Sequence, residues 1–171
     1  MPKTPDDLLA YLSENGIAAK TYTHPPLHTV AESKALRGDI PGAHTKNLFL
    51  RDAKKTYFLV TLGEETPVDL KALRGLIGAR GGLSFASAEA LFEKLGVLPG
   101  AVTLLAASND PNHAVRVVIE AALLDAPLVN CHPLTNERTT SLTPEALLAF
   151  LRLTGHEPLR IDLAPGAAPQ A

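Results

Sequence analysis

Three clusters of polar residues could carry chemistry in this chain. They are Lys46-Asn47, the loop at residues 96–100, and Asn130-x-His132 together with Thr139 and Thr140. A loop with two glycines lets backbone N–H groups approach a carbonyl oxygen or a developing oxyanion, and histidine can exchange a proton near neutral pH. Each cluster also has a structural interpretation: a solvated lysine, a helix cap followed by a turn, and a histidine bonded at a strand end. Taken singly, none of them identifies a reaction.

Motifs of several other reaction classes are absent from the sequence. There is no Walker loop, GxGxxG, GxSxG or HExxH motif, and there are no paired cysteines. His24 and His28 are four residues apart, but Pro25 and Pro26 prevent the helix that would bring both imidazoles to one face. The sequence therefore predicts no metal site and no cofactor.

The first cluster begins a predicted β-hairpin. The stretch at residues 45–52 starts with polar residues and passes into an apolar run, and a second strand-like run at residues 57–62 follows after a short turn rich in lysine. This hairpin would hold Lys46 and Asn47 at the mouth of a strand, where a cleft could lie.

The remaining chain alternates helices and strands irregularly. Helix starts with a hydroxyl cap are predicted at Thr4, Thr29, Thr66, Ser87 and Thr143. The predicted strands, besides the hairpin, span residues 17–23, 83–85, 101–106, 115–119, 128–132, 139–142 and 159–163. This order is not a regular βαβ repeat, so the fold class is predicted as α+β: a single domain with a mixed, curved central sheet flanked by helices. The domain spans residues 1–163, and the small residues and prolines of 164–171 predict a disordered tail.

Composition excludes several classes of protein. A net charge of −2, an aromatic fraction of 5% and the absence of Trp argue against a broad nucleic-acid binder or an extended stacking platform, although a local basic patch could still contact one RNA end. Cys131 is the only cysteine, so no internal disulfide can form, and it is expected to be a core residue. With neither a signal peptide nor about 20 consecutive apolar residues, we expect a cytoplasmic protein without membrane contact.

The clusters occur in an order that resembles a known family. The residues that carry the resemblance are Thr29-Val30-Ala31-Glu32, Lys46-Asn47-Leu48-Phe49-Leu50, Gly96-Val97-Leu98-Pro99-Gly100, and Asn130-x-His132-Pro133 with Asn136 and Thr139. Together they resemble the YbaK/prolyl-tRNA-synthetase-associated editing domain over residues 4–155. The 96–100 loop and Ser108-Asn109-Asp110 are most similar to its freestanding Ala-tRNA(Pro) deacylases, the ProXp-ala or PrdX-like branch.

The resemblance implies a trans-editing hydrolase that cleaves the ester of alanine mischarged on proline tRNA, without a cofactor. It assigns catalysis to Lys46, with Asn47 beside it. The implied substrate-binding residues are Gly96, Val97, Pro99, Gly100 and His132, and Val30, Ser33 and Leu36 are predicted to form the size filter. The candidates for contact with the tRNA acceptor end are Arg37, Arg51 and Arg138. Association with prolyl-tRNA synthetase is left open.

Three alternatives remain at this point. The first is a deacylase of the same family that acts on Cys-tRNA(Pro). The second is a non-catalytic nucleic-acid-binding module on the same fold, which predicts a basic face and strong salt dependence. The third is a hydrolase or binding protein for a small molecule.

Overall fold

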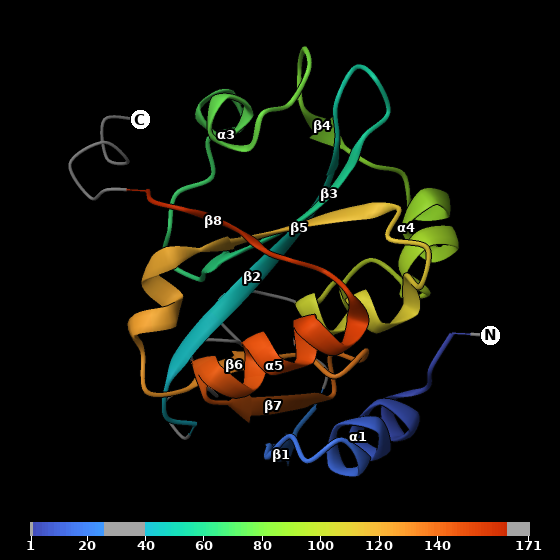
Figure 1. Cartoon of the computed structure of the whole chain (residues 1–171), viewed down its shortest axis with the longest axis vertical. Helices are drawn as coiled ribbons and strands as arrows, with labels where there is room; N and C mark the ends of the chain where they lie inside the picture. The colour runs from blue at the N-terminus through green and yellow to red at the C-terminus, as the bar shows by residue number, and fades with distance from the viewer. Residues whose placement is uncertain (1, 26–39, 164–171) are drawn as a thin grey trace.

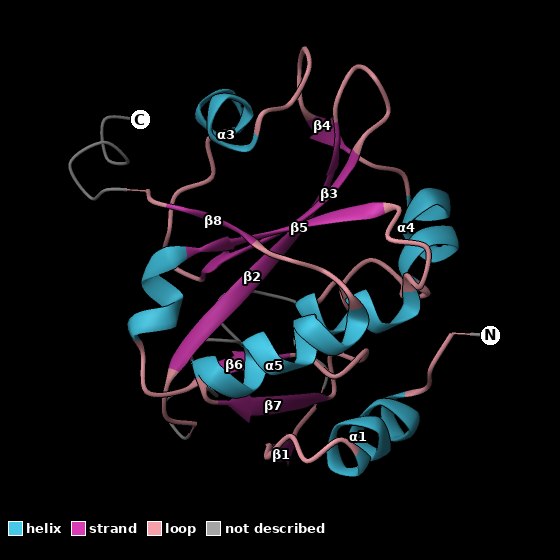
Figure 2. Ribbon diagram, viewed as in Figure 1, coloured by secondary structure: helices cyan, strands magenta, loops and turns pink. Residues whose placement is uncertain are grey.

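The computed structural model describes residues 2–25 and 40–163, and an eight-stranded mixed sheet organises them (Figures 1 and 2). The strands are β1 Lys20–Thr23, β2 Ala43–Arg51, β3 Tyr57–Gly63, β4 Ser84–Phe85, β5 Val115–Glu120, β6 Val129–Cys131, β7 Arg138–Leu142 and β8 Leu159–Ile161. Their order is β1-β7-β6-β2-β3-β5-β8, and β4 pairs with β2. Parallel pairs (β2–β6, β3–β5, β5–β8) and antiparallel pairs (β1–β7, β6–β7, β2–β3, β2–β4) coexist, which confirms the predicted mixed sheet.

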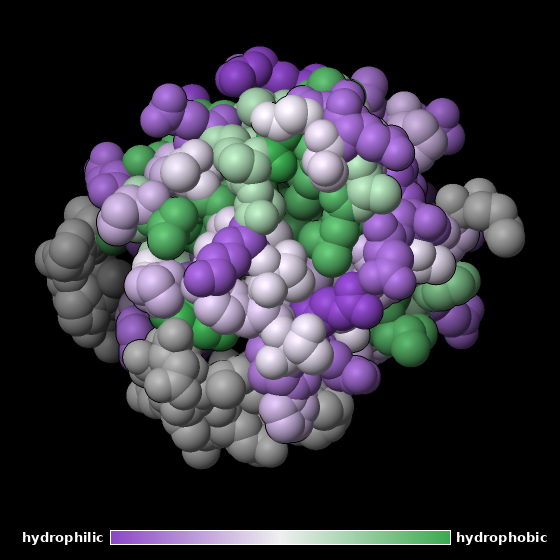
Figure 3. Space-filling model, turned by 90° about the horizontal axis from the view of Figure 1, so that it is seen from below, coloured by the Kyte–Doolittle hydropathy of each residue, from purple (hydrophilic) through white to green (hydrophobic). Residues whose placement is uncertain are grey.

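Helices lie at both ends of the sheet. They are α1 Pro5–Glu14, α3 Leu70–Ile77, α4 Ala88–Leu95 and α5 Pro144–Thr154, with 3₁₀ helices η1 Leu104–Asn109 and η2 Ala121–Asp125. The starts predicted at Thr4, Ser87 and Thr143 are confirmed, since each hydroxyl accepts a backbone N–H of the first turn. Figure 1 places α1 and α5 toward one end of the molecule and α3 at the other. Seen from below, the α1 end mixes hydrophilic and hydrophobic residues (Figure 3).

Two apolar clusters cover opposite faces of the β2–β3 hairpin. Alternation along the strands sends Phe49 and Leu59 into the larger cluster, which α1, α4 and α5 also enter. The same alternation sends Leu50 and Val60 into the smaller cluster, which α3 covers. This half of the sheet therefore serves as packed core rather than as a binding face.

The helix start predicted at Thr66 is wrong. α3 begins at Leu70, and its N-cap is Asp69, whose carboxylate accepts two backbone N–H groups at 3.1 Å. The Thr66 hydroxyl instead donates to a carboxylate oxygen of Glu120 at 2.7 Å. A tertiary hydrogen bond has thus displaced the local capping pattern.

The strand predicted at residues 101–106 is also wrong. The apolar run forms η1, in which Leu104 and Leu105 are fully buried and the Thr103 hydroxyl caps the Leu105 N–H at 3.2 Å. A short apolar run fits a buried helical turn as well as a strand, so its period could not discriminate between them.

Three further predictions concern Cys131, the helix from Thr29 and the tail at residues 164–171. Cys131 is buried in the larger apolar cluster, as predicted, and desolvation raises the pKa of its thiol to about 12. The helix predicted from Thr29 and the tail at 164–171 lie outside the described residues. Among the described helices, none is long and apolar enough to cross a membrane.

Candidate active site

One face of the sheet is polar where β1, β7, β6 and the first half of β2 lie side by side. Alternation places His44 and Lys46 on the same face of β2, and strand register adds Asn130 opposite His44 and Ser141 opposite Asn130. The opposite face of these strands enters the apolar core through Val129 and its partner Leu142. We call the first surface the polar face; its residues are His24, His44, Lys46, Asn130, His132, Thr139 and Ser141.

Lys46 lies within β2, opposite Leu62, and its side chain is partly exposed. Its ammonium donates a hydrogen bond to the backbone carbonyl of Thr66. Glu120 holds that carbonyl in place, because its Oε1 accepts the Gly63 N–H at 2.9 Å and the Thr66 hydroxyl at 2.7 Å. An ammonium has three N–H donors, and the Thr66 carbonyl is the one acceptor of Lys46 within residues 2–25 and 40–163, so two donors are available for a ligand there. Lys46 is therefore a held, partly exposed cation on the polar face.

Asn47 points to the other side of the sheet. Its Oδ1 accepts the Thr61 hydroxyl at 2.6 Å, and its Nδ2 is buried without a hydrogen-bond partner among the described residues. Neighbouring residues of a strand face opposite ways, so the predicted pair Lys46-Asn47 does not converge on one ligand from one face.

Asn130 joins the strands beneath Lys46. Its Nδ2 donates to the carbonyls of Pro41 at 3.1 Å and Ala43 at 3.2 Å, and its Oδ1 accepts the Ser141 hydroxyl. Its backbone carbonyl accepts the Thr45 hydroxyl at 2.7 Å. Asn130 is buried and uses both of its N–H donors, so it fixes the start of β2 against β6 rather than binding a ligand.

His132 contributes a partly buried imidazole to the polar face. Its Nδ1–H donates to the Arg138 carbonyl at 3.2 Å, so Nε2 carries the lone pair in the neutral ring. Burial lowers the pKa of His132, and repulsion from the neighbouring His24 and His44 whenever these are protonated lowers it further, against the opposing effects of the Arg138 bond and Glu64. The imidazole is therefore neutral at pH 7 and can accept a proton or a hydrogen bond from water.

His24 is the second buried histidine of the polar face. Its Nδ1–H donates to the Pro25 carbonyl at 2.8 Å, so in the neutral ring Nε2 accepts the Thr139 hydroxyl at 2.8 Å. Both nitrogens are thus engaged, and His24 supports the face rather than offering a free base. Within residues 2–25 and 40–163, no group of three His, Cys, Asp or Glu side chains could hold a metal ion.

The glycine loop has two ends with different surroundings. Gly96 ends α4 in the left-handed conformation (φ 66°), and its N–H bonds to Phe92, as a helix C-cap requires. At the other end, Gly100 (φ 91°) is exposed, and a Cβ added to it would lie 3.9 Å from the Asn136 amide nitrogen. Asn136 is in the turn that carries His132, so the exposed end of the loop borders the His132 region. The helix-cap interpretation is confirmed at Gly96, and ligand binding at the Gly100 end stays a prediction.

Comparison with known proteins decides the family. A family model described as "Aminoacyl-tRNA editing domain" matches residues 24–150, and these include Lys46, the glycine loop and His132. The chain belongs to the aminoacyl-tRNA editing domain family. The predicted resemblance is thereby confirmed.

Relatives agree over nearly the whole chain. Prolyl-tRNA synthetase associated domain-containing protein 1 of Bos taurus is 38% identical over 155 residues, covering 88% of this chain and 90% of the relative. Prolyl-tRNA editing protein ProX of Acetoanaerobium sticklandii is 33% identical over 157 residues, covering 91% and 95%. A crystal structure of a candidate trans-editing enzyme for prolyl tRNA synthetase shares the fold, with a TM-score of 0.68 at 22% identity over 94% of this chain and 98% of that one.

The predicted tRNA contacts of this editing domain are dispersed. Arg51 is at the far end of β2, about 17 Å from Lys46 at roughly 3.4 Å per residue. Arg138 is nearer, since its carbonyl bonds to His132, but its guanidinium donates to Asp6 at 2.8 Å in an exposed ion pair. The predicted residues Val30, Ser33, Leu36 and Arg37 lie outside the described residues.

Three residues of the site were not predicted from the sequence: His44, Thr66 and Glu120. His44 could have been found by the two-residue period from Lys46, because i and i+2 share a face of a strand. Thr66 was interpreted as a helix cap, and Glu120 was assigned no role. No local pattern links either one to Lys46, since Glu120 is 57 residues beyond Gly63.

Proposed function

We propose that this editing domain hydrolyses the aminoacyl ester of alanine mischarged on proline tRNA. The observation that carries the proposal is the polar face: it combines a held, partly exposed Lys46 ammonium with the neutral imidazole of His132 in a chain of the aminoacyl-tRNA editing family. An aminoacyl ester is already activated, so the enzyme needs only to position water and stabilise the tetrahedral oxyanion.

Each group has a proposed role at the ester. The two remaining N–H donors of Lys46 contact the terminal phosphate, the ribose or the developing negative charge. Backbone N–H groups of Val97, Leu98 and Gly100 orient the aminoacyl group, while Pro99 has no N–H to donate. His132, through Nε2, accepts a hydrogen bond from the attacking water or from the ribose 2′-hydroxyl, which can itself assist the water. No metal is part of this mechanism.

The substrate follows from the limits of the synthetase. A pocket built for proline cannot strongly exclude alanine, because missing methylenes are worth only about 1–3 kcal/mol. A second, smaller hydrolytic site removes the error, since proline does not enter it. Val30, Ser33 and Leu36 remain our proposed size filter.

Cys-tRNA(Pro) is the alternative substrate. The relatives' names refer to prolyl-tRNA editing and to association with the synthetase, and they specify no amino acid. From these names we propose proline tRNA as the partner, with prolyl-tRNA synthetase as a second candidate partner. We propose alanine as the amino acid because the 96–100 loop resembles that of the alanine-specific branch.

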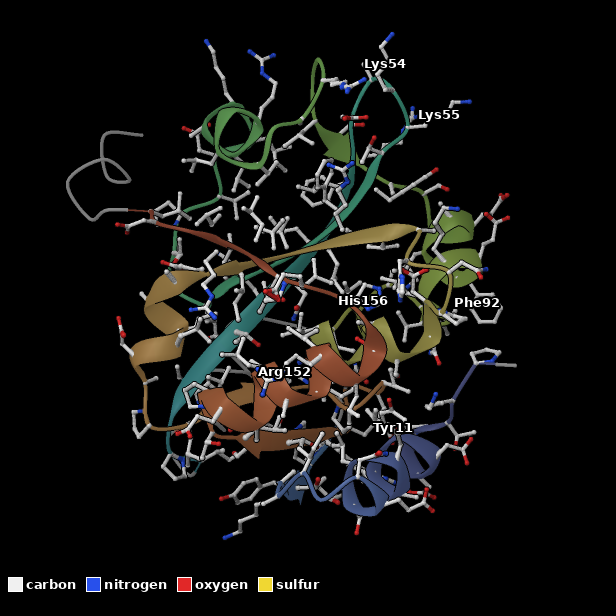
Figure 4. All side chains as sticks on the ribbon, viewed as in Figure 1. Tyr11, Lys54, Lys55, Phe92, Arg152 and His156 are labelled. Carbon is white, nitrogen blue, oxygen red and sulfur yellow. The ribbon has the colours of Figure 1, made fainter. Side chains whose placement is uncertain are left out.

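A deacylation assay tests the proposal. Ala-tRNA(Pro), Cys-tRNA(Pro) and Pro-tRNA(Pro) are incubated with wild type, Lys46→Ala and Arg152→Ala, the last a matched control on the exposed side of α5 (Figure 4). We expect selective loss of the alanyl ester, reduced about 10²-fold or more in Lys46→Ala and unchanged in the control. Preference for the cysteinyl ester would replace the substrate. Survival of all three esters with folded protein would favour the non-catalytic binding module.

A further inference from the structure

Charge is distributed unevenly over the molecule. The β2–β3 turn with its flanks (residues 51–56) and α3 with the loop that follows it (70–83) form what we call the basic end. It contains six of the sixteen cations of the chain and one of its eighteen acids, so it carries a charge of +5 while the rest of the chain carries −7. The cations are Arg51, Lys54, Lys55, Lys71, Arg74 and Arg80. A protein that is acidic overall thus presents a concentrated positive potential at one end.

The single acid of the basic end holds its two segments together. Asp52 is 3% exposed, and its carboxylate accepts the backbone N–H groups of Lys54 and Thr56 at 2.9 Å and of Arg80 at 3.0 Å. Burial by itself would raise the pKa of Asp52, but the three N–H donors reverse that effect and lower it. Asp52 is therefore turned inward, and its charge is taken up by the backbone. Figure 4 shows Lys54 and Lys55 extending outward from the end of the hairpin.

A hollow of about 380 Å³ opens beside this turn. It is lined by Arg51, Lys55, Tyr57, Ser84, Phe85 and Ser87. Phe85 is 60% exposed, although it is a large apolar side chain on a paired strand. Cations, hydroxyl groups and an exposed aromatic ring are the groups that bind the phosphates and stack on the bases of a single-stranded nucleic acid.

We propose that the basic end binds single-stranded RNA, with a phosphate at Arg51 and Lys55 and a base stacked on Phe85. The inference rests on the proposed function for the identity of the RNA, which is then the strand of the tRNA substrate that precedes the ester. Arg51 is about 17 Å from Lys46 along β2, a span of several nucleotides, and it lies on the opposite face of that strand. The RNA would therefore pass around the edge of the sheet and not across its packed faces. The low aromatic content of the chain is consistent with a subsite for one nucleotide rather than an extended stacking platform.

RNA fits this end better than an acidic protein segment. A carboxylate-bearing peptide would satisfy the cations but would leave the exposed Phe85 ring without a planar partner. The hydroxyl groups of Ser84 and Ser87 add donors to the same hollow.

Fluorescence anisotropy with a labelled single-stranded RNA oligonucleotide and with uncharged proline tRNA tests the proposal. The variants are the pair Arg51→Gln/Lys55→Gln, the single change Phe85→Ala, and the control pair Arg152→Gln/Arg160→Gln, which removes the same charge from exposed positions elsewhere. We expect the first pair to weaken binding at least about tenfold and to reduce the slope of log K against log salt by about 0.7, the value for one phosphate on a single strand. Phe85→Ala should weaken binding about 5- to 100-fold and leave the slope unchanged.

Three results would overturn the inference: absence of RNA binding by the wild type, equal losses in the control pair, or full affinity in Phe85→Ala. Deacylation separates this inference from the proposed function. RNA binding with the expected losses in the variants, but without hydrolysis of any ester, would contradict the proposed function and leave the RNA subsite supported. Hydrolysis of Ala-tRNA(Pro) with the same KM in all variants would contradict the RNA subsite and leave the proposed function supported.

Discussion

Glu120 is expected to control the position of Lys46 without touching the substrate. Its carboxylate is 7% exposed and accepts two hydrogen bonds, from the Gly63 N–H and the Thr66 hydroxyl. The Thr66 carbonyl in turn accepts the Lys46 ammonium. Glu120→Ala should therefore release the turn at residues 63–66 and, with it, the carbonyl that orients Lys46.

The size of the effect follows from the two orphaned donors. A buried donor that loses its acceptor costs about 1–3 kcal/mol, and both Gly63 and Thr66 are partly exposed, so about 2–3 kcal/mol in total is expected. For a domain of this size, each kcal/mol lowers Tm by roughly 2–4 °C, so Glu120→Ala should lose about 4–12 °C. A displacement of Lys46 by about 1 Å should also reduce the rate of deacylation about 10²-fold.

Glu120→Gln is the matched control, because its amide oxygen can still accept both hydrogen bonds. Thermal denaturation and single-turnover deacylation of Ala-tRNA(Pro) are measured for both variants. We expect the glutamine variant to retain most of the rate and to lose about 1 kcal/mol of stability. An additional pair, Thr66→Val and Thr66→Ser, separates the hydroxyl from the bulk of the side chain.

Two outcomes would refute this reasoning. If Glu120→Ala keeps the wild-type Tm, the two hydrogen bonds do not stabilise the turn. If it loses stability but retains the full single-turnover rate, the turn does not position Lys46.

Three other predictions concern single residues. Gly42→Ala should lower the free energy of unfolding by more than about 3 kcal/mol in urea denaturation, because φ is 110° and a Cβ would lie 2.8 Å from the Leu128 Cβ. The control Gly16→Ala (φ 72°, nothing within 4 Å) should cost about 1 kcal/mol, and equal losses in the two variants would contradict the packing argument. Because the pKa of His132 is below the ordinary 6.5, kcat/KM should be flat at pH 6.5 and above and should fall only as the pH approaches that lowered pKa. Stability should fall from about pH 6.5 downward, since the unfolded chain binds the proton more readily, and His132→Gln should weaken both dependences. Cys131, with a pKa of about 12, should resist alkylation at pH 8 until the protein unfolds, whereas rapid labelling of the folded protein would show that the thiol is accessible.

Local features of the fold were predictable from the sequence. The hairpin of β2 and β3, the caps at Thr4 and Thr143 and the edge strand β8 all follow from patterns within a few residues. The two wrong predictions arose because tertiary contacts overrode the local pattern. At Thr66 the cause was a hydrogen-bond partner distant in the sequence, and at residues 101–106 it was burial of the apolar run.

The sequence by itself determined the fold class, most of the helix and strand types and, through the order of its motifs, the family. Alternation, capping and turn chemistry act over a few residues, so they can be interpreted without the fold. Only the tertiary structure decided that Lys46 and Asn47 face opposite sides of the sheet, that His132 shares the face of Lys46, and that Glu120 holds Lys46 through Thr66. Such relations depend on the register between strands that are far apart in the chain, and a shift of one residue in that register would move every one of these side chains to the other face.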